Sequence, residues 1–186
     1  MSSTEPRRTA LDALHRSLGA TMTDFAGWDM PLRYGSERDE HNAVRNRAGL
    51  FDLSHMGEIT VTGPQAAALL DHALVGNMSG VKEGRARYTM IVTEQGGVLD
   101  DLIVYRLADD DYLVVANAAN TGTVAAALTE RAAGFTATIT DETADYALLA
   151  LQGPQSAAIL GPLTDVDLSA LRPYAAQHGT VAGTAV

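Results

Sequence analysis

The segment GGVLDDLIVY, Gly96–Tyr105, places two adjacent carboxylates at the start of an apolar, β-branched run. The glycines predict a turn, and the run that follows predicts a buried strand. Because side chains alternate faces along a strand, Asp100 and Asp101 must point to opposite sides of the sheet. The carboxylate on the covered side costs several kcal/mol unless it is paired, protonated or functional, which makes it the first candidate for chemistry. The alternative is that both are turn residues of a Gly-Gly hairpin.

Composition limits the classes of protein to which the chain can belong. Its 186 residues suffice for one good core or two small lobes, and 46% hydrophobic with 19% charged residues is an ordinary globular balance. A net charge of −10 without a basic stripe disfavours nucleic acid as a partner. No apolar run approaches the roughly 20 residues that span a bilayer, so we expect no membrane partner.

The termini and the cysteine count give further expectations. Met1–Arg8 is polar and does not read as a secretory signal. The chain has no cysteine, which excludes disulfides and thiolate metal sites and is compatible with a cytoplasmic location. We expect no metal, because His41 has no second His or Cys at ligand spacing and reads as a surface residue. By default, His55 reads as a structural histidine whose hydrogen bonds are satisfied.

Before the central segment, the pattern predicts short elements. Thr9–Leu18 reads as a helix with a capping box from Thr9 to Asp12 and a stop at Gly19. A strand, Thr21–Phe25, is expected to lead into a loop over Ala26–Pro31 that holds the only Trp as a core plug. Further expectations are a helix from Ser36, an extended segment at Leu50–Ser54 and a strand at Glu58–Thr62.

An internal echo indicates two lobes. Val61–Leu70 resembles Leu151–Leu160, since in each a strand ends at Gly, Pro occupies the first helical turn and an Ala-rich helix follows. Between the two copies, the pattern predicts a three-strand antiparallel meander, then a helix and a returning strand. The expected elements are Arg87–Val92, Val98–Leu107, Tyr112–Asn117, Thr121–Arg131 and Thr136–Thr140. The predicted fold class is α/β of the α+β type, with two lobes of antiparallel sheets flanked by helices.

Several motifs together resemble the aminomethyltransferase, or T-protein, of the glycine cleavage system. They follow the same order as in that family and cover nearly the whole chain. The motifs are FAGWDMPL at Phe25–Leu32, EHNAVR at Glu40–Arg45, FDLSHMG at Phe51–Gly57, the Gly96–Tyr105 segment, VANAAN at Val115–Asn120 and LQGP at Leu151–Pro154.

This resemblance implies a reaction and its participants. The family transfers a one-carbon unit from the aminomethyl-lipoyl arm of the H-protein to tetrahydrofolate, its co-substrate, and releases ammonia. The family's acid against the folate ring nitrogens matches Asp101, which leaves Asp100 a structural role. Strand parity agrees, because Asp101, Ile103 and Tyr105 share one face. The other positions that match the folate pocket are Tyr88, Asn117 and Met56, the last of which is equally compatible with core filling.

The resemblance also implies a domain division and leaves alternatives open. The family arrangement suggests a first domain of residues 1–56 and 144–186 and a second of residues 57–143, which carries the Asp101 strand. Members of the family are longer than this chain, so we expect an amino-terminal half. The alternatives are a truncated, non-catalytic fragment that binds folate or the H-protein, and a folate-binding relative that repairs iron–sulfur enzymes. The folate domain of a sarcosine or dimethylglycine dehydrogenase is a further possibility.

Overall fold

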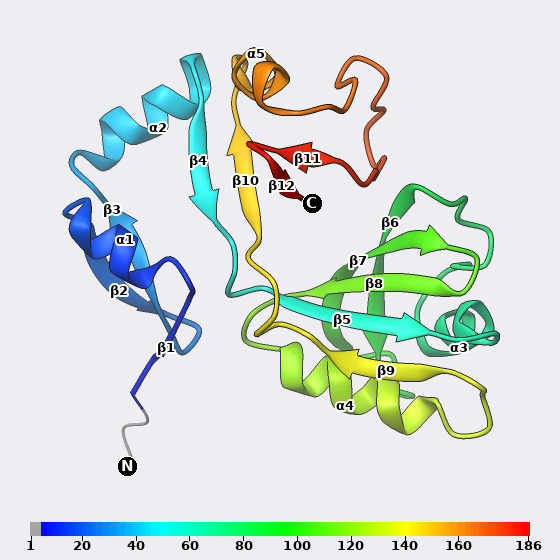
Figure 1. The fold of residues 1–186 in the computed structure, drawn as a ribbon. Coiled ribbons are helices and arrows are strands. Elements are labelled where there is room, and N and C mark those ends of the chain that lie inside the picture. The colour runs from blue at the N-terminus through cyan, green and yellow to red at the C-terminus, as the bar shows by residue number, and fades with distance from the viewer. Residues whose placement is uncertain (1–4) are drawn as a thin grey trace.

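The computed structural model describes residues 5–186 and shows two lobes joined side by side (Figure 1). The expected polar amino terminus, Met1–Arg8, falls partly outside the described residues. The first lobe contains β1 (Arg7–Arg8), α1 (Asp12–Ser17), β2 (Thr21–Phe25), β3 (Trp28–Arg33), α2 (Glu37–Asn46), β4 (Gly49–Asp52), β10 (Leu149–Gln152), α5 (Ser156–Leu160), a 3-10 turn (Gly161–Leu163), β11 (Thr180–Val181) and β12 (Thr184–Ala185). The second contains β5 (Gly57–Thr62), α3 (Ala66–Ala73), β6 (Arg85–Val92), β7 (Val98–Ala108), β8 (Asp111–Ala116), α4 (Thr121–Arg131) and β9 (Thr138–Asp141).

The second lobe is a five-stranded antiparallel sheet in the order β6-β7-β8-β5-β9. Helices α3 and α4 cover one face, and their side chains share one apolar cluster with alternate strand residues. In β7, Leu102 and Val104 are buried in this cluster, while Asp101 is exposed and Ile103 half-buried on the other face. The expected meander is confirmed, and the helix over Thr121–Arg131 has the bounds that the sequence predicts.

The first lobe differs from expectation at its first hairpin. Only Ala26 and Gly27 form the turn, with φ of 55° and 79°, and Trp28 already begins β3. Two left-handed residues close a two-residue hairpin tightly, so the predicted loop is wrong beyond Gly27. Pro31 is tolerated in the strand because it lies beside an irregularity in the pairing with β2. Trp28 is 5% exposed, which confirms its expected burial.

The helix starts show one correct and one wrong prediction. The Ser36 hydroxyl accepts a hydrogen bond from the Asp39 amide (3.3 Å) and caps α2, as expected. The predicted cap at Thr9 is wrong, because α1 begins only at Asp12 and the Thr9 hydroxyl donates instead to the Asp52 carboxylate (2.7 Å). Within residues 5–186, the Thr9 oxygen accepts only from the Leu11 amide (3.3 Å), which precedes α1, while its proton goes to a charged acceptor.

The echo is confirmed as two strand–turn–helix units. Gly63 and Gly153 have φ of 116° and 120°, a region that only glycine adopts readily. A Cβ on Gly153 would stand 2.6 Å from the carbonyl oxygen of Val44. Pro64 and Pro154 each lie two residues before the helix instead of within its first turn.

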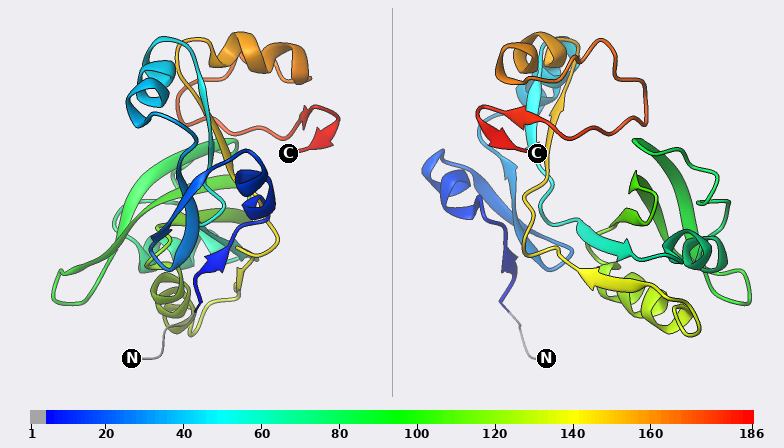
Figure 2. Two further views of the ribbon diagram at one scale, coloured as in Figure 1. Left: turned by 90° about the vertical axis from the view of Figure 1, so that its left-hand side faces the viewer. Right: turned by 45° about the vertical axis from the view of Figure 1, so that its right-hand side comes forward.

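Two connections run between the lobes, residues 53–56 from β4 to β5 and residues 142–148 from β9 to β10. We call these two segments the junction. Their amides pair across it, since Leu53 donates to the Leu148 carbonyl (2.8 Å) and Leu148 donates to the Ser54 hydroxyl (3.1 Å). Residues 173–176, which we call the bridge, lie along β6 through hydrogen bonds between Ala86 and Tyr174 (2.8 Å). The lobes thus meet at the junction and again at the bridge, and Figure 2 shows the two connections of the junction side by side.

Within the described part of the chain, residues 5–186, no helix is long and apolar enough to cross a membrane.

Candidate functional site

The sheet of the second lobe has an open face opposite α3 and α4, and the predicted site residues gather on it. The strand register pairs Tyr88 with Ile103, and Ile103 in turn with Val115, so one cross-strand row runs over three strands. Asp101 lies one step along β7 from this row and Tyr105 one step the other way. The structure therefore brings together residues that the sequence separates.

The Asp101 carboxylate is exposed and held from two sides. The Tyr88 hydroxyl donates to its Oδ2 at 2.7 Å, and the Asn117 side-chain amide donates to its Oδ1 at 3.2 Å. The hydrogen bond to Asp101 raises the pKa of Tyr88, because a phenolate there would face a carboxylate. Both partners thus fix the orientation of Asp101 while its outer side stays open to a ligand.

Asp100 has the opposite environment and is 3% exposed. Its carboxylate accepts hydrogen bonds from the Asn117 backbone amide (2.9 Å), the Asn117 side chain (3.0 Å) and the Asn120 side chain (2.6 Å). The covered carboxylate is therefore fully paired, and the first interpretation, that the covered one of the pair carries the chemistry, is wrong. Asp100 instead holds Asn117, which in turn contacts Asp101.

Apolar and aromatic side chains flank the carboxylate. Ile103 and Tyr105 are half-buried, and burial raises the pKa of the Tyr105 hydroxyl. Met56 is half-buried in the junction, one residue before Gly57, which pairs with Ala116. Met56 therefore lies opposite Asn117, the residue that follows β8. The predicted residues form one surface with a charged centre and an apolar margin.

Sequence reasoning missed Tyr174. This residue belongs to the bridge and adopts φ of 60°, a left-handed conformation that is uncommon for a tyrosine. Its carbonyl oxygen accepts from the Ala86 amide at the edge of β6 (2.8 Å), and its phenol lies within electrostatic range of Tyr88 and Tyr105. Tyr174 therefore extends the aromatic margin from the first lobe. No periodic pattern marks it, because its position depends on the pairing of residues far apart in sequence.

His55 is buried, but its Nδ1 has no hydrogen-bond partner among residues 5–186. The expectation of a fully satisfied histidine is therefore wrong. Its ring lies edge-on to Phe25 with 5.4 Å between centroids, and burial lowers its pKa. His41 is exposed, as predicted.

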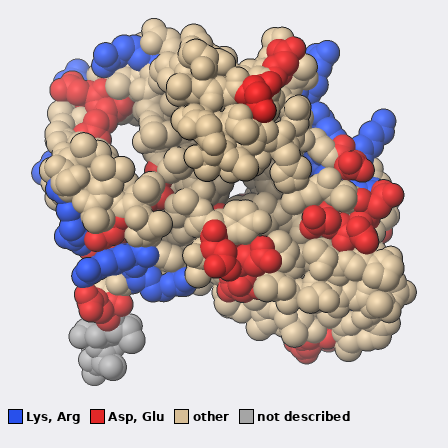
Figure 3. All heavy atoms as spheres, viewed as in Figure 1, with Lys and Arg blue, Asp and Glu red and all other residues tan. Residues whose placement is uncertain are grey.

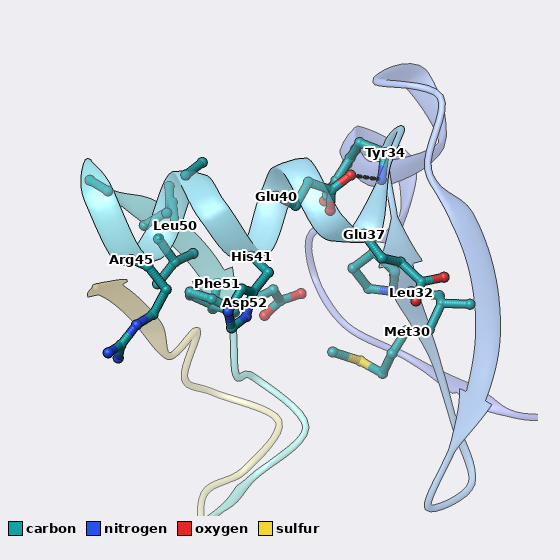
Figure 4. A pocket seen from close by; sticks show the side chains of 15 residues that line it. Met30, Leu32, Tyr34, Glu37, Glu40, His41, Arg45, Leu50, Phe51 and Asp52 are labelled. Atoms are coloured by element: carbon teal, nitrogen blue, oxygen red, sulfur yellow. Dashed lines mark hydrogen bonds between the residues drawn. The ribbon is translucent and has the colours of Figure 1, made fainter. Parts of the chain in front are cut away.

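A second hollow lies in the first lobe, between α2, β3 and β4 (Figure 4). It measures about 570 Å³, and Leu32, Leu50 and Phe51 give it a mainly apolar wall. At its end, His15 bonds the Tyr34 hydroxyl through Nδ1 (2.6 Å) and the Asp52 carboxylate through Nε2 (2.8 Å). These polar groups satisfy one another, so the network serves to tie α1, β3 and β4 together.

Charge is distributed unevenly over the surface. Acidic side chains form several clusters, whereas Lys and Arg stand at the margins without a continuous basic stripe on the face that Figure 3 shows. Among residues 5–186, no group of three or more His, Cys, Asp or Glu side chains is placed to hold a metal ion. The open face therefore offers one oriented carboxylate, amide and phenol groups, and apolar walls.

Comparisons with known proteins agree on one family. The model of the GCVT N-terminal domain matches residues 11–186. The aminomethyltransferase of Streptomyces coelicolor is 73% identical over 183 residues, which are 98% of this chain and 49% of that protein. The aminomethyltransferase of Saccharopolyspora erythraea is 59% identical over 181 residues. The chain thus spans about half the length of the curated relatives it matches.

Solved structures give the same result. The glycine cleavage system aminomethyltransferase T from Bartonella henselae matches with a TM-score of 0.84 and 42% identity, over 89% of this chain and 45% of that one. The heterotetrameric sarcosine oxidase from Corynebacterium sp. U-96 matches with a TM-score of 0.59 at 15% identity, over 97% of this chain and 79% of that one. The second likeness concerns the fold alone.

Proposed function

The chain belongs to the aminomethyltransferase family of the glycine cleavage system, and we propose that its open face is the tetrahydrofolate site of such an enzyme. The reaction moves the aminomethyl carbon from the lipoyl arm of the H-protein to tetrahydrofolate and releases ammonia. The observation that carries the proposal is the exposed Asp101 carboxylate, oriented by Tyr88 and Asn117 on a face walled by Ile103 and Tyr105.

The donor set on this face fits a reduced pterin. A pterin edge presents N–H groups, and a carboxylate that is held but still open can accept from them. Tyr105, Met56 and Tyr174 offer flat or adaptable apolar surface for the rest of the folate. No metal is needed for this recognition.

Asp101 has two tasks in the proposed reaction. Its negative charge stabilises cationic character on the one-carbon unit, since Tyr88 and Asn117 orient it without neutralising it. It also accepts a hydrogen bond from the folate nitrogen that loses a proton on attack, and the departing ammonia needs a proton in return. Orientation and proton transfer would therefore pass through the same carboxylate.

We propose further that residues 57–143 form a domain inserted between residues 1–56 and 144–186, and that the lipoylated H-protein is the partner. A second candidate, which the open and oriented Asp101 carboxylate supports equally, is a chain that binds folate without turnover. The two candidates differ only in what happens after binding.

Calorimetric titration with tetrahydrofolate tests both candidates. We expect saturable binding that Asp101→Asn weakens at least tenfold, since a hydrogen bond to a charged group contributes about 1.5–3 kcal/mol. Asp110→Asn, an exposed carboxylate in the turn between β7 and β8, serves as the control and should bind like the parent chain. Equal affinity in the Asp101 and Asp110 variants would refute the site. Product formation with aminomethylated H-protein then separates the enzyme from the binding fragment.

A further inference from the structure

Part of the junction, together with the adjacent Glu58, is buried yet poorly paired. Ser54, His55, Thr143 and Glu58, the second residue of β5, are all buried there. Among residues 5–186, five buried side-chain nitrogen or oxygen atoms lack a hydrogen-bond partner. Three of these five belong to the junction region, namely His55 Nδ1 and both carboxyl oxygens of Glu58. A cluster of unpaired polar atoms in a covered place costs stability and calls for an explanation.

The backbone of Glu58 ties the sheet to the second connection. Its amide donates to the Thr143 hydroxyl at 3.1 Å, and its carbonyl oxygen accepts from the Glu142 amide at 2.9 Å. Its side chain lies on the same side of the sheet as Val115 and Ile103, because these residues are paired across the strands. Glu58 is nevertheless only 2% exposed, in contrast to the open part of this face.

The charges around Glu58 disfavour its ionised form. The titratable groups on the segments around it are Asp141 of β9, Glu142, Asp145 and Tyr146 of the second connection, and His55 of the first. Arg7 and Arg8 line a hollow beside Thr143 and Tyr146. Among residues 5–186, none of the ion pairs includes Glu58. Burial and then Asp141 raise the pKa of Glu58 to about 7, and burial lowers the pKa of His55. Burial therefore disfavours the charged form of both groups.

We propose that Glu58 is a proton-controlled latch, which holds the two lobes at their observed spacing when it is protonated and releases the junction when it loses its proton. A buried carboxylate without a hydrogen-bond partner is unstable when it is ionised, and Asp141 repels its charge as well. The hydrogen bonds that link the two connections at this point include those from Leu53 to Leu148, from Leu148 to Ser54 and from Glu58 to Thr143, and the Glu142 amide donates to the Glu58 carbonyl. Water that enters to solvate Glu58 competes with these bonds, and the connections separate.

Release of the junction changes the candidate site because the junction and the bridge both connect the first lobe to the open face. Met56 lies in one connection, and Tyr174 lies in the bridge on β6. A movement at the junction therefore shifts Met56 relative to the Asp101 strand. The latch does not depend on which ligand the site takes.

Distance measurements across the lobes test the latch directly. The chain has no cysteine, so Arg38→Cys in α2 and Glu130→Cys in α4 give two unique, exposed labelling positions. Spin labels at these positions report the spacing by double electron–electron resonance at about pH 6 and about pH 8.5, on either side of the transition. We expect a narrow distance distribution at the lower pH and a longer, broader one at the higher pH.

Variants identify the responsible group. Glu58→Gln, which cannot ionise, should keep the narrow distribution at both pH values, whereas the matched control Glu142→Gln should respond like the parent. An unchanged distribution in the parent chain overturns the latch whatever the variants do. A Glu58→Gln variant whose distance distribution still changes with pH also overturns the latch, because another group must then cause the change.

Discussion

The adjacent carboxylates of β7 should respond in opposite ways to the same substitution. Asp100→Asn replaces an acceptor that is 3% exposed and takes three hydrogen bonds from Asn117 and Asn120. An asparagine can accept on one side only and turns its own NH₂ group toward a donor on the other. One charged hydrogen bond is lost outright and two are weakened, so we expect a loss of about 2–4 kcal/mol of unfolding free energy.

Urea unfolding followed by circular dichroism measures this loss. With a slope of about 2 kcal/mol per molar urea, the midpoint should fall by about 1–2 M. Asp101→Asn is the matched control, because it removes a carboxylate from an exposed position where the new amide oxygen can still accept from Tyr88. Its midpoint should move by less than about 0.5 M.

Binding should show the reverse order. Asp101→Asn loses affinity for tetrahydrofolate while it stays as stable as the parent, and Asp100→Asn loses affinity only in proportion to its unfolded fraction and to any movement of Asn117. An Asp100→Asn variant with the parent midpoint, or an Asp101→Asn variant that is the less stable of the two, would refute the assignment of the structural carboxylate.

Three further predictions concern other parts of the chain. Glu58→Gln should raise the unfolding free energy by about 3 kcal/mol at pH 8 and have little effect below pH 4.5. The folded pKa of about 7 lies above the unfolded value of 4.5, so the parent chain loses stability as pH rises between these values. Urea midpoints at a series of pH values measure the difference between variant and parent, and a difference that does not change with pH would contradict the prediction. Asp52→Asn should lower the stability of the protein above pH 3.8, where the parent carboxylate is ionised and hydrogen-bonded. Burial raises the pKa of Asp52, but the bonds from His15, Ser54 and Thr9 outweigh it and lower the pKa, so the parent loses this stability only as pH falls further. Acid titration of the fluorescence of both proteins measures the difference, and identical acid midpoints would argue against it. Gly153→Ala should lower the unfolding free energy, measured by thermal unfolding, by about 2–4 kcal/mol, because its Cβ would meet two backbone carbonyl oxygens. The control Gly122→Ala has open space in α4 and should be neutral or stabilising by up to about 1 kcal/mol, so similar effects of the two changes would contradict this explanation.

Local patterns predicted the second lobe well because its strands pair with near neighbours in sequence. The alternating side chains of β7 and the Ala-rich sequence of α4 each predict one buried face, and these two faces pack together in the core of the same lobe. Strand parity also placed Asp101, Ile103 and Tyr105 on one side without any structure. What parity could not decide was which side is covered, because that depends on where α3 and α4 pack.

The errors share a physical cause, which is contact between distant residues. Thr9 was expected to cap its own helix, but its hydroxyl bonds Asp52, which lies 43 positions away. Tyr174 escaped notice because it reaches the site through pairing with Ala86. His55 and Glu58 were not expected to be buried without partners, because the second connection that covers them follows more than 80 residues later.

The geometry of β7 explains why a structural carboxylate and the proposed functional one can be adjacent in sequence. Adjacent strand residues face opposite environments, so Asp100 can be buried against Asn117 and Asn120 while Asp101 stays open. Asn117 links the two, because its single side-chain amide donates to both carboxylates, at 3.0 Å and 3.2 Å. The buried hydrogen bonds of Asp100 therefore set the position of the amide that orients Asp101. A change on the covered side of the sheet should consequently affect the open side. We expect Asn117→Ala to weaken ligand binding more than the loss of its two exposed hydrogen bonds to Asp101 would account for.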